Sequence, residues 1–182
     1  MAAVKRHAEA GGLVLGICNG FQVLLEAGLL PGAMRKNAGL RFECRDVHVR
    51  IERADVPFLR GYRAGQVVRM PIAHAEGNYE NSPAALDLLE QNQQVVLRYV
   101  APDGTVDPAW NCNGSARAIA GVVNATGTVM GLMPHPERCA EEVVGNTDGL
   151  ALFAGLIASA VPKPRPLPPM AARPARRSGA RA

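Results

Sequence analysis

The chain has 182 residues, of which 48% are hydrophobic, and a formal net charge of +4. This length suits one globular domain with a real core, and the sequence has no run of 18 apolar residues that could span a membrane. The first ten residues carry positive charge without an apolar stretch before a cleavage site, so they do not resemble a signal peptide, and we expect a cytoplasmic protein that binds no membrane.

The positive charge is concentrated at the C-terminus. Residues 161–182 contain six Lys or Arg residues, six prolines and no acidic residue. These six charges exceed the net charge of the whole chain, so the remainder is slightly acidic and offers no basic face for a nucleic acid. We predict one domain over residues 1–160 and a disordered, partly polyproline-like tail over residues 161–182.

The N-terminal part predicts a helix, a strand and a second helix. Residues 2–10 form a helical pattern that a Gly pair ends, and the apolar run 13–17 is typical of a buried parallel strand. A second helix over residues 21–27 follows, with its apolar residues on one face. Because Cys18 comes between this strand and this helix, we expect it at a strand-to-helix turn.

The remainder of the chain predicts mostly strands. We expect a loop at 29–37, strands at 42–51, 66–70, 94–100, 118–124 and 128–133, and helices at 83–91 and 148–160. The parity of the apolar residues changes within the first of these strands, which suggests a bulge near Asp46, and Pro71 is expected to end the second. The last two strands form a hairpin. This mixture predicts an α/β protein with an antiparallel portion beside a parallel sheet.

Four cysteines are present, and their spacing argues against several kinds of site. They lie far apart with no Cys-x-x-Cys pair, so we predict no zinc site, no redox dithiol and no disulfide framework. We interpret Cys44, Cys112 and Cys139 as structural, and Trp110, the single tryptophan, as a packing residue.

The remaining cysteine, Cys18, lies between two glycines in a short motif. Residues 16–20 read Gly-Ile-Cys-Asn-Gly, the cysteine version of a nucleophile elbow. The nucleophile in such a turn is strained, and small residues on both sides leave room for the crossing strand and helix. The N-terminus of the following helix is expected to favour the Cys18 thiolate, and the backbone N–H of Asn19 would donate to an oxyanion. A buried structural cysteine is the alternative interpretation of the pentapeptide alone.

A thiolate nucleophile needs a histidine to exchange protons and a group that orients this histidine. Two of the four histidines are interpreted as solvated or surface residues, His7 and His48. His135 stands between two prolines that keep it out of a sheet ladder, and Glu137 follows two residues later on the same side. His74 and Glu76 form a second His-x-Glu pair, so residue chemistry alone leaves both pairs open.

Three blocks of the sequence, taken in order, resemble one family. They are G-I-C-N-G-F-Q at residues 16–22, P-I-A-H-A-E-G-N-Y at 71–79 and G-L-M-P-H-P-E-R at 131–138, with N-G-S at 113–115 between the last two. The first and third are shared across class I glutamine amidotransferases. The second, with the N-G-F-Q continuation, is similar to the glutaminase subunit of phosphoribosylformylglycinamidine synthase. The resemblance runs to about Ala160 and implies an α/β, flavodoxin-like mixed sheet flanked by helices.

The resemblance implies a division of labour. Cys18 attacks the side-chain amide of glutamine, His135 protonates the leaving ammonia and activates water against the thioester, and Glu137 orients His135. Gln22 and His74 are expected to help bind glutamine. Ammonia passes to a large synthetase subunit, which uses ATP and Mg to convert formylglycinamide ribonucleotide to the amidine in purine biosynthesis, and a small third subunit bridges the two. The chain itself is expected to hold no cofactor or metal.

The family also has an N-terminal stretch that this sequence lacks, so we expect the early strands of the parallel sheet to be missing. That stretch carries a Gly-Gly loop that supplies a second oxyanion donor, and the loss of one such donor typically costs about 100- to 1,000-fold in rate. One alternative is therefore a catalytically inactive, truncated docking subunit of the same complex. A γ-glutamyl hydrolase with the same Cys-His-Glu set is the other.

Overall fold

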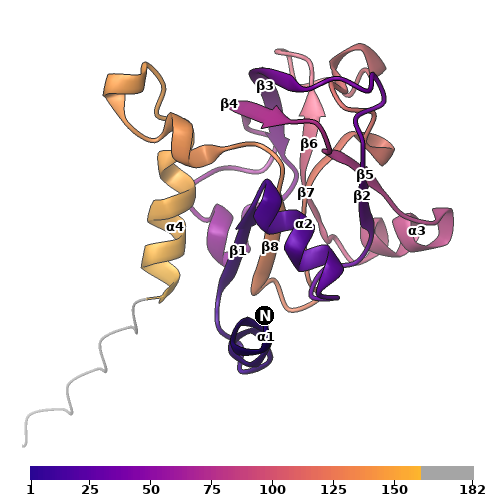
Figure 1. The fold of residues 1–182 in the computed structure, drawn as a ribbon. Helices are drawn as coiled ribbons and strands as arrows, with labels where there is room; N and C mark the ends of the chain where they lie inside the picture. The colour runs from indigo at the N-terminus through magenta and orange to yellow at the C-terminus, as the bar shows by residue number, and fades with distance from the viewer. Residues whose placement is uncertain (161–182) are drawn as a thin grey trace, which may run out of the picture.

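A mixed sheet of six strands organises residues 1–160, the part of the chain that the computed structural model describes (Figure 1). The tail predicted over residues 161–182 lies outside the described residues. The strand order is β1-β8-β7-β6-β3-β4, and β2 and β5 form a separate two-stranded ribbon. The pair β1–β8 is parallel and the other neighbours in the sheet are antiparallel, which confirms the predicted mixed sheet.

The elements are short, and strands outnumber α-helices. The strands are β1 (Val14–Ile17), β2 (Ala33–Arg35), β3 (Glu43–Ile51), β4 (Val67–His74), β5 (Asn78–Glu80), β6 (Val95–Val100), β7 (Ile119–Val123) and β8 (Val129–Leu132). The α-helices are α1 (Ala2–Glu9), α2 (Asn19–Glu26), α3 (Pro83–Gln91) and α4 (Leu150–Ala160). Short 3-10 helices are η1 (Pro57–Leu59), η2 (Pro108–Trp110), η3 (Ala116–Ala118), η4 (Pro136–Cys139) and η5 (Glu142–Val144). Within residues 1–160, no helix has both the length and the apolar character needed to cross a membrane.

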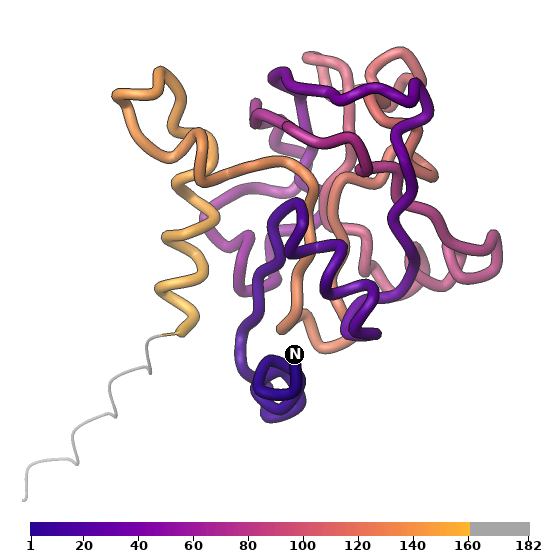
Figure 2. Tube along the Cα trace, in the orientation of Figure 1, coloured from indigo at the N-terminus to yellow at the C-terminus, as the bar shows by residue number. Residues whose placement is uncertain are grey.

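Helices cover both faces of the sheet. Helices α2 and α3 bury Phe21 and Leu86 in a cluster with residues of β7 and β8. On the other face, η1 and α4 contribute Phe58 and Leu152 to a second cluster. By contrast, α1 lies apart at one end of the sheet and buries none of its residues (Figures 1 and 2). The core therefore lies on the two faces of the sheet, and α1 adds little to it.

The sheet curls, so that its two edge regions approach each other. Strand β4 is one edge, yet the Pro71 carbonyl accepts a hydrogen bond of 2.8 Å from the His135 N–H, which follows β8 near the opposite edge. The Cys18 Sγ, just after β1, lies 3.9 Å from the Ala73 carbonyl oxygen. The ends of β1, β4 and β8 therefore meet at one place, although they come from three distant parts of the chain.

Two predictions about the strands are wrong. Pro71 does not end a strand, because β4 continues through it to His74. The Pro71 carbonyl points away from β3 and accepts a hydrogen bond from the His135 N–H. In an antiparallel pair the nitrogen and the carbonyl of one residue point to the same side, so the Pro71 nitrogen also points away from β3. The N–H that proline lacks would therefore make no hydrogen bond to β3. The expected bulge near Asp46 is absent, since β3 and β4 pair residue by residue, and the irregular pairing lies between β6 and β7. The parity changes because β3 before Val47 is largely exposed, where no core selects apolar residues.

Other predictions are confirmed. Helix α3 begins at Pro83, behind Ser82, whose hydroxyl accepts a hydrogen bond from the Ala85 N–H. Strands β7 and β8 form the predicted hairpin. Strand β1 is a parallel strand, as predicted, and its partner is β8; it is half-buried rather than buried, because β8 is its single neighbour among the described strands. The predicted loop 29–37 contains one short strand, β2.

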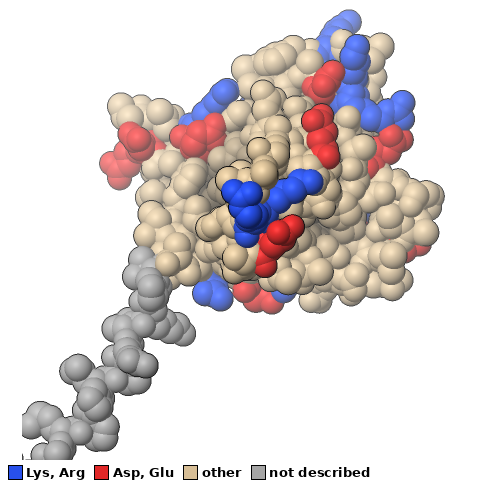
Figure 3. All heavy atoms as spheres, turned by 60° about the horizontal axis from the view of Figure 1, so that its bottom comes forward, with Lys and Arg blue, Asp and Glu red and all other residues tan. Residues whose placement is uncertain are grey.

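Charged side chains of both signs are mixed on the surface. On the face drawn in Figure 3, Lys and Arg lie beside Asp and Glu rather than in one basic field. The most buried ion pairs centre on Arg98, whose side chain is 11% exposed. Its guanidinium lies 2.6 Å from both oxygens of Glu90 and 3.3 Å from Glu52. This cluster ties β6 to α3 and to the end of β3.

Candidate active site

Cys18 occupies a strained turn between β1 and α2. Its backbone angles are φ 50° and ψ −107°, a conformation that side-chain-bearing residues rarely adopt and that is common at functional sites. The Cys18 N–H donates to the Leu132 carbonyl at 2.8 Å, which extends the pairing of β1 with β8 to the cysteine. The predicted strand-to-helix elbow is therefore confirmed as a structure.

The two glycines of the elbow differ in what they do. A Cβ atom on Gly16 would lie 2.5 Å from a methyl carbon of Leu24 and 2.7 Å from the backbone of Gly20, so a side chain does not fit. A Cβ atom on Gly20 would meet nothing within 4 Å. The prediction that both positions must be small to make room is therefore confirmed at Gly16 and wrong at Gly20.

The surroundings of the Cys18 sulfur do not by themselves produce a thiolate. The side chain is 7% exposed, and this burial raises the pKa of the Cys18 thiol above its usual value. The backbone N–H of Asn19 and the positive charge of Arg138 lower the pKa, but by less than burial raises it. The expectation that the N-terminus of α2 would favour the thiolate is thus outweighed, and Cys18 needs a base to remove its proton.

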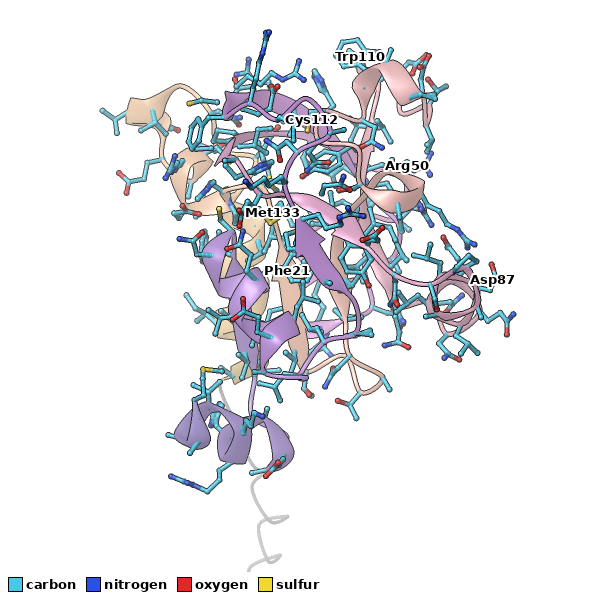
Figure 4. The ribbon with its side chains drawn as sticks, turned by 45° about the vertical axis from the view of Figure 1, so that its right-hand side comes forward. Phe21, Arg50, Asp87, Trp110, Cys112 and Met133 are labelled. Atoms are coloured by element: carbon cyan, nitrogen blue, oxygen red, sulfur yellow. The ribbon has the colours of Figure 1, made fainter. Side chains whose placement is uncertain are left out.

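A histidine with an orienting carboxylate follows β8, the strand that pairs with β1. His135 Nδ1 is 2.5 Å from Glu137 Oε1, and the His135 side chain is 9% exposed. The carboxylate accepts a hydrogen bond from Nδ1–H, so in the neutral ring the other nitrogen, Nε2, carries a lone pair. This Nε2 atom is buried without a hydrogen-bond partner among the described residues. Met133, which comes between β8 and His135, packs in the same cluster as Cys18 and Phe21. Figure 4 labels Met133 and Phe21 in this region.

The end of β4 and the residues after it, 73–76, form a wall of the site, here called the wall segment. A hollow of about 290 Å³ is lined by residues from two sides, namely Asn19, Gln22, Phe42, Ala73, His74, Ala75 and Glu76. His74 is 4% exposed, and burial together with nearby His135 lowers its pKa to about 4. The imidazole is therefore neutral at physiological pH. The structure thus brings His74 into the same site as Cys18 and His135, and the second His-x-Glu pair is a neighbour of the first.

Gln22 connects the elbow helix to this wall. Its Nε2 atom donates to the Glu76 carbonyl at 2.7 Å. The side chain lines the hollow described above and a second one of about 180 Å³ beside Met34. Gln22 is therefore placed at the site, and in this structure its amide holds the wall segment in position. Its predicted contact with glutamine stays a prediction.

Sequence reasoning missed several buried polar residues behind the wall. Asn37, in the predicted loop 29–37, is 1% exposed and bonds to His74 and to Gly77. Asn113 and Ser115, noted only as part of a shared motif, both donate to the Gly77 carbonyl, at 2.7 and 3.1 Å. These residues have no helical or strand periodicity, so nothing in the local sequence signals their burial.

The other three cysteines, His48 and Trp110 do not line this hollow. Burial raises the pKa of Cys112 to about 12 and that of Cys139 to about 11, as suits structural thiols, whereas Cys44 is exposed and packs in no core. His48, interpreted as a surface residue, is half-buried and meets the edge of the Trp110 ring at a centroid distance of 6.0 Å. Cys112 and Trp110 lie at the same end of the molecule (Figure 4).

Comparison with known proteins places this geometry in context. A family model described as a CobB/CobQ-like glutamine amidotransferase domain matches residues 1–149. The phosphoribosylformylglycinamidine synthase subunit PurQ of Bradyrhizobium diazoefficiens is 57% identical over 156 residues, 86% of this chain and 67% of that protein. The PurQ subunit of Gloeobacter violaceus is 55% identical over 161 residues, 88% of this chain and 69% of that protein. The chain thus spans about two thirds of the length of these relatives.

Solved structures give the same result for the fold. The structure of PurLQS from Thermotoga maritima matches with a TM-score of 0.73 and 41% identity, and the match covers 85% of this chain and 65% of that one. A protein of Thermoplasma acidophilum assigned to GMP synthase matches with a TM-score of 0.53 at 16% identity, over 87% of this chain and 62% of that one, which shows a shared fold alone. The predicted α/β fold is confirmed by these likenesses.

Proposed function

Because this chain belongs to the PurQ family of glutamine amidotransferases, we propose that it is the glutaminase subunit of a phosphoribosylformylglycinamidine synthase. It hydrolyses glutamine to glutamate and ammonia through Cys18, His135 and Glu137. The observation that carries the proposal is the strained elbow at Cys18, with φ 50°, together with a buried histidine just after β8, the strand paired with β1, whose Nδ1 lies 2.5 Å from a carboxylate oxygen. Strain at one cysteine and an oriented base beside it are the two parts that nucleophilic acyl transfer requires.

The proposed reaction begins with proton transfer. His135 Nε2, the nitrogen with a free lone pair, takes the proton of the Cys18 thiol, and the sulfur attacks the carboxamide carbon of glutamine. The developing oxyanion accepts a hydrogen bond from the Asn19 backbone N–H, which already faces the sulfur. The C–N bond then breaks as His135 returns the proton to the leaving ammonia. Water, deprotonated by His135, attacks the thioester and releases glutamate and the thiol.

The raised pKa of Cys18 is consistent with this sequence of steps. A buried thiol without substrate stays protonated and is protected from unspecific alkylation. Glu137 stabilises the imidazolium that forms when His135 takes the proton, as the orienting carboxylate of a triad does. The wall segment, with His74 and the Gln22-bound Glu76, lines the hollow beside Cys18 and is the proposed binding place of glutamine.

The partners follow from the relatives. The solved PurLQS structure has a name that covers three kinds of subunit, and this chain resembles one of its chains at 41% identity. We therefore infer that ammonia passes to a large synthetase subunit, with a small third subunit in the complex. ATP and Mg are used by the synthetase, which converts formylglycinamide ribonucleotide to the amidine.

An inactive docking subunit of the same complex is the second candidate function. The observation that favours it is the raised pKa of Cys18, which leaves the side chain a poor nucleophile unless His135 acts on it. The two candidates differ in one measurable property. An active subunit is alkylated at Cys18 by an electrophile that mimics glutamine, and the labelling is suppressed by glutamine. An inactive subunit binds the synthetase without being labelled.

The decisive experiment measures ammonia release from free glutamine, with and without the synthetase. We expect release that increases in the complex, that is lost in Cys18→Ser and that persists in Cys44→Ser, because Cys44 is exposed and lies outside the site. Release of glutamate from γ-glutamyl peptides, without release of ammonia from free glutamine, would instead indicate a γ-glutamyl hydrolase. Absence of release and of labelling in the intact complex would refute the catalytic proposal.

A further inference from the structure

The polar groups around Asn37 determine how its side-chain amide is oriented. Asn37 Nδ2 lies 2.8 Å from the Arg41 carbonyl oxygen and 2.9 Å from the His74 carbonyl oxygen. Both are acceptors, so this end of the amide must be the NH2 group. The Oδ1 atom lies 3.0 Å from the Gly77 backbone N–H, which can only donate. Three independent neighbours therefore agree on the orientation.

This orientation also fixes where the proton of His74 lies. The Asn37 Oδ1 atom is 3.1 Å from His74 Nδ1, and an amide oxygen can only accept a hydrogen bond. Nδ1 must therefore carry a hydrogen. In a neutral imidazole with a proton on Nδ1, the other nitrogen has a lone pair and no proton. His74 Nε2 is buried and has no hydrogen-bond partner among the described residues.

We propose that Asn37 is a positioning residue that holds His74 as the neutral Nδ1–H tautomer, so that His74 Nε2 accepts a hydrogen bond from an N–H group of the substrate. The inference deepens the proposed function and rests on it in naming the substrate. Glutamine has two such N–H groups, the α-ammonium and the carboxamide NH2. A second acceptor in the site thus lies beside His135, and it holds the substrate rather than moving a proton.

Charges around His74 are consistent with a permanently neutral ring. His135, from the segment after β8, lowers the pKa of His74, and Glu43, from the paired strand β3, raises it. Burial lowers the pKa of His74 by more than either charge changes it. Cys18 faces the same segment through the Ala73 carbonyl. Gly77 packs closely against the ring, since a Cβ atom there would lie 2.2 Å from His74 Cε1.

The first test uses the unaltered protein and needs no activity. Two-bond ¹H–¹⁵N correlation spectra of the imidazole nitrogens distinguish the two neutral tautomers and the charged form. We expect His74 to show the Nδ1–H tautomer and to stay neutral from about pH 5 upward, because burial opposes the charged form. A proton on Nε2, or titration near the usual histidine pKa, would overturn the proposal even if the protein proves to be an active glutaminase.

The second test compares two buried asparagines that hold the same segment. Asn37→Asp places a carboxylate beside His74 Nδ1, which favours the imidazolium. The acid limb of the pH–rate profile of the complex should move up by about one to three pH units, the shift that a close opposite charge produces. Asn113→Asp is the control, because Asn113 bonds to Gly77 and Tyr99 but not to the imidazole. A shift of equal size in the control would show that disturbance of the wall, not the state of His74, changes the profile.

Substrate analogues identify the donated N–H group. A diazoketone analogue of glutamine keeps the α-ammonium but lacks the carboxamide NH2. Asn37→Ala should raise the KM for glutamine about tenfold, the worth of one hydrogen bond, with a smaller effect on kcat. Equal weakening of diazoketone labelling assigns the contact to the α-ammonium, and unchanged labelling assigns it to the carboxamide. An unchanged KM with unchanged labelling would overturn the inference.

Discussion

Replacing Gly16 by Ala should damage the elbow, because the new methyl group has no space. Its carbon would lie 2.5 Å from Leu24 Cδ1 and 2.7 Å from both the carbonyl carbon and oxygen of Gly20. Leu24 can turn its side chain, but the Gly20 backbone belongs to α2 and can only move with the helix. Such overpacking typically costs about 1–3 kcal/mol of unfolding free energy.

This cost can be measured by thermal unfolding. For a domain of this size, 1 kcal/mol corresponds to about 2–4 °C, so we expect the midpoint to fall by roughly 2–12 °C. The glutaminase rate should fall further, since a displacement of the elbow of about 1 Å can cost on the order of 100-fold in rate. The loss of rate should appear in kcat, because the nucleophile is misplaced rather than the glutamine pocket.

The matched control is Gly20→Ala in the same elbow. No atom lies within 4 Å of the new Cβ, and Gly20 is in the first turn of α2, where Ala is the better helix former by up to about 1 kcal/mol. The control should unfold at the same temperature or slightly higher. If Gly16→Ala and Gly20→Ala lowered the midpoint equally, or if Gly16→Ala left it unchanged, the steric argument for Gly16 would be refuted.

Three further predictions concern charges and protons. Glu137→Gln keeps the shape of the side chain beside His135 but removes the charge that stabilises the imidazolium. Steady-state kinetics should show that kcat falls by about 100-fold or more. Calorimetry should show little change in thermal stability. Arg98→Met leaves Glu90 and Glu52 without their shared cation and should cost about 2–4 kcal/mol in urea unfolding, less than a fully buried pair because both carboxylates are partly exposed; an unchanged midpoint would contradict this. Since the pKa of Cys18 is raised, its thiolate fraction at neutral pH is below that of a free thiol. Iodoacetamide should therefore alkylate Cys18 far more slowly than it alkylates an exposed cysteine. Mass spectrometry should show that the alkylation rate of Cys18 still rises about tenfold per pH unit above about pH 8.

Local sequence patterns were sufficient where one segment decides its own structure. The elbow at residues 16–20, helix α3 behind Ser82 and the hairpin of β7 and β8 all depend on neighbouring residues, and all are confirmed. Pairing of His135 with Glu137 belongs to the same class, because residues two apart in an extended turn lie on one side. The resemblance to glutamine amidotransferases likewise rests on short contiguous blocks.

Tertiary structure alone decided what surrounds Cys18, the proposed nucleophile. Curling of the sheet brings the end of β4 to Cys18, so Ala73 and His74 enter the site from more than fifty positions away. The same curling explains why Pro71 is tolerated within β4, since its carbonyl bonds outward to the segment after β8. No local pattern records a contact between distant strand ends, because such a contact depends on the shape of the whole sheet.

The protonation states of the site show the same division. The sequence predicts that the N-terminus of the helix after Cys18 favours the thiolate. Desolvation has the opposite effect and raises the pKa of the Cys18 thiol, because it depends on every residue packed around the sulfur. Asn37 falls in a predicted loop, although it is 1% exposed and determines the tautomer of His74. The sequence by itself identified the family, the elbow at Cys18 and the pairing of His135 with Glu137. The tertiary structure decided their dielectric surroundings and hydrogen-bond partners, because burial is a property of the packed chain and not of any single segment.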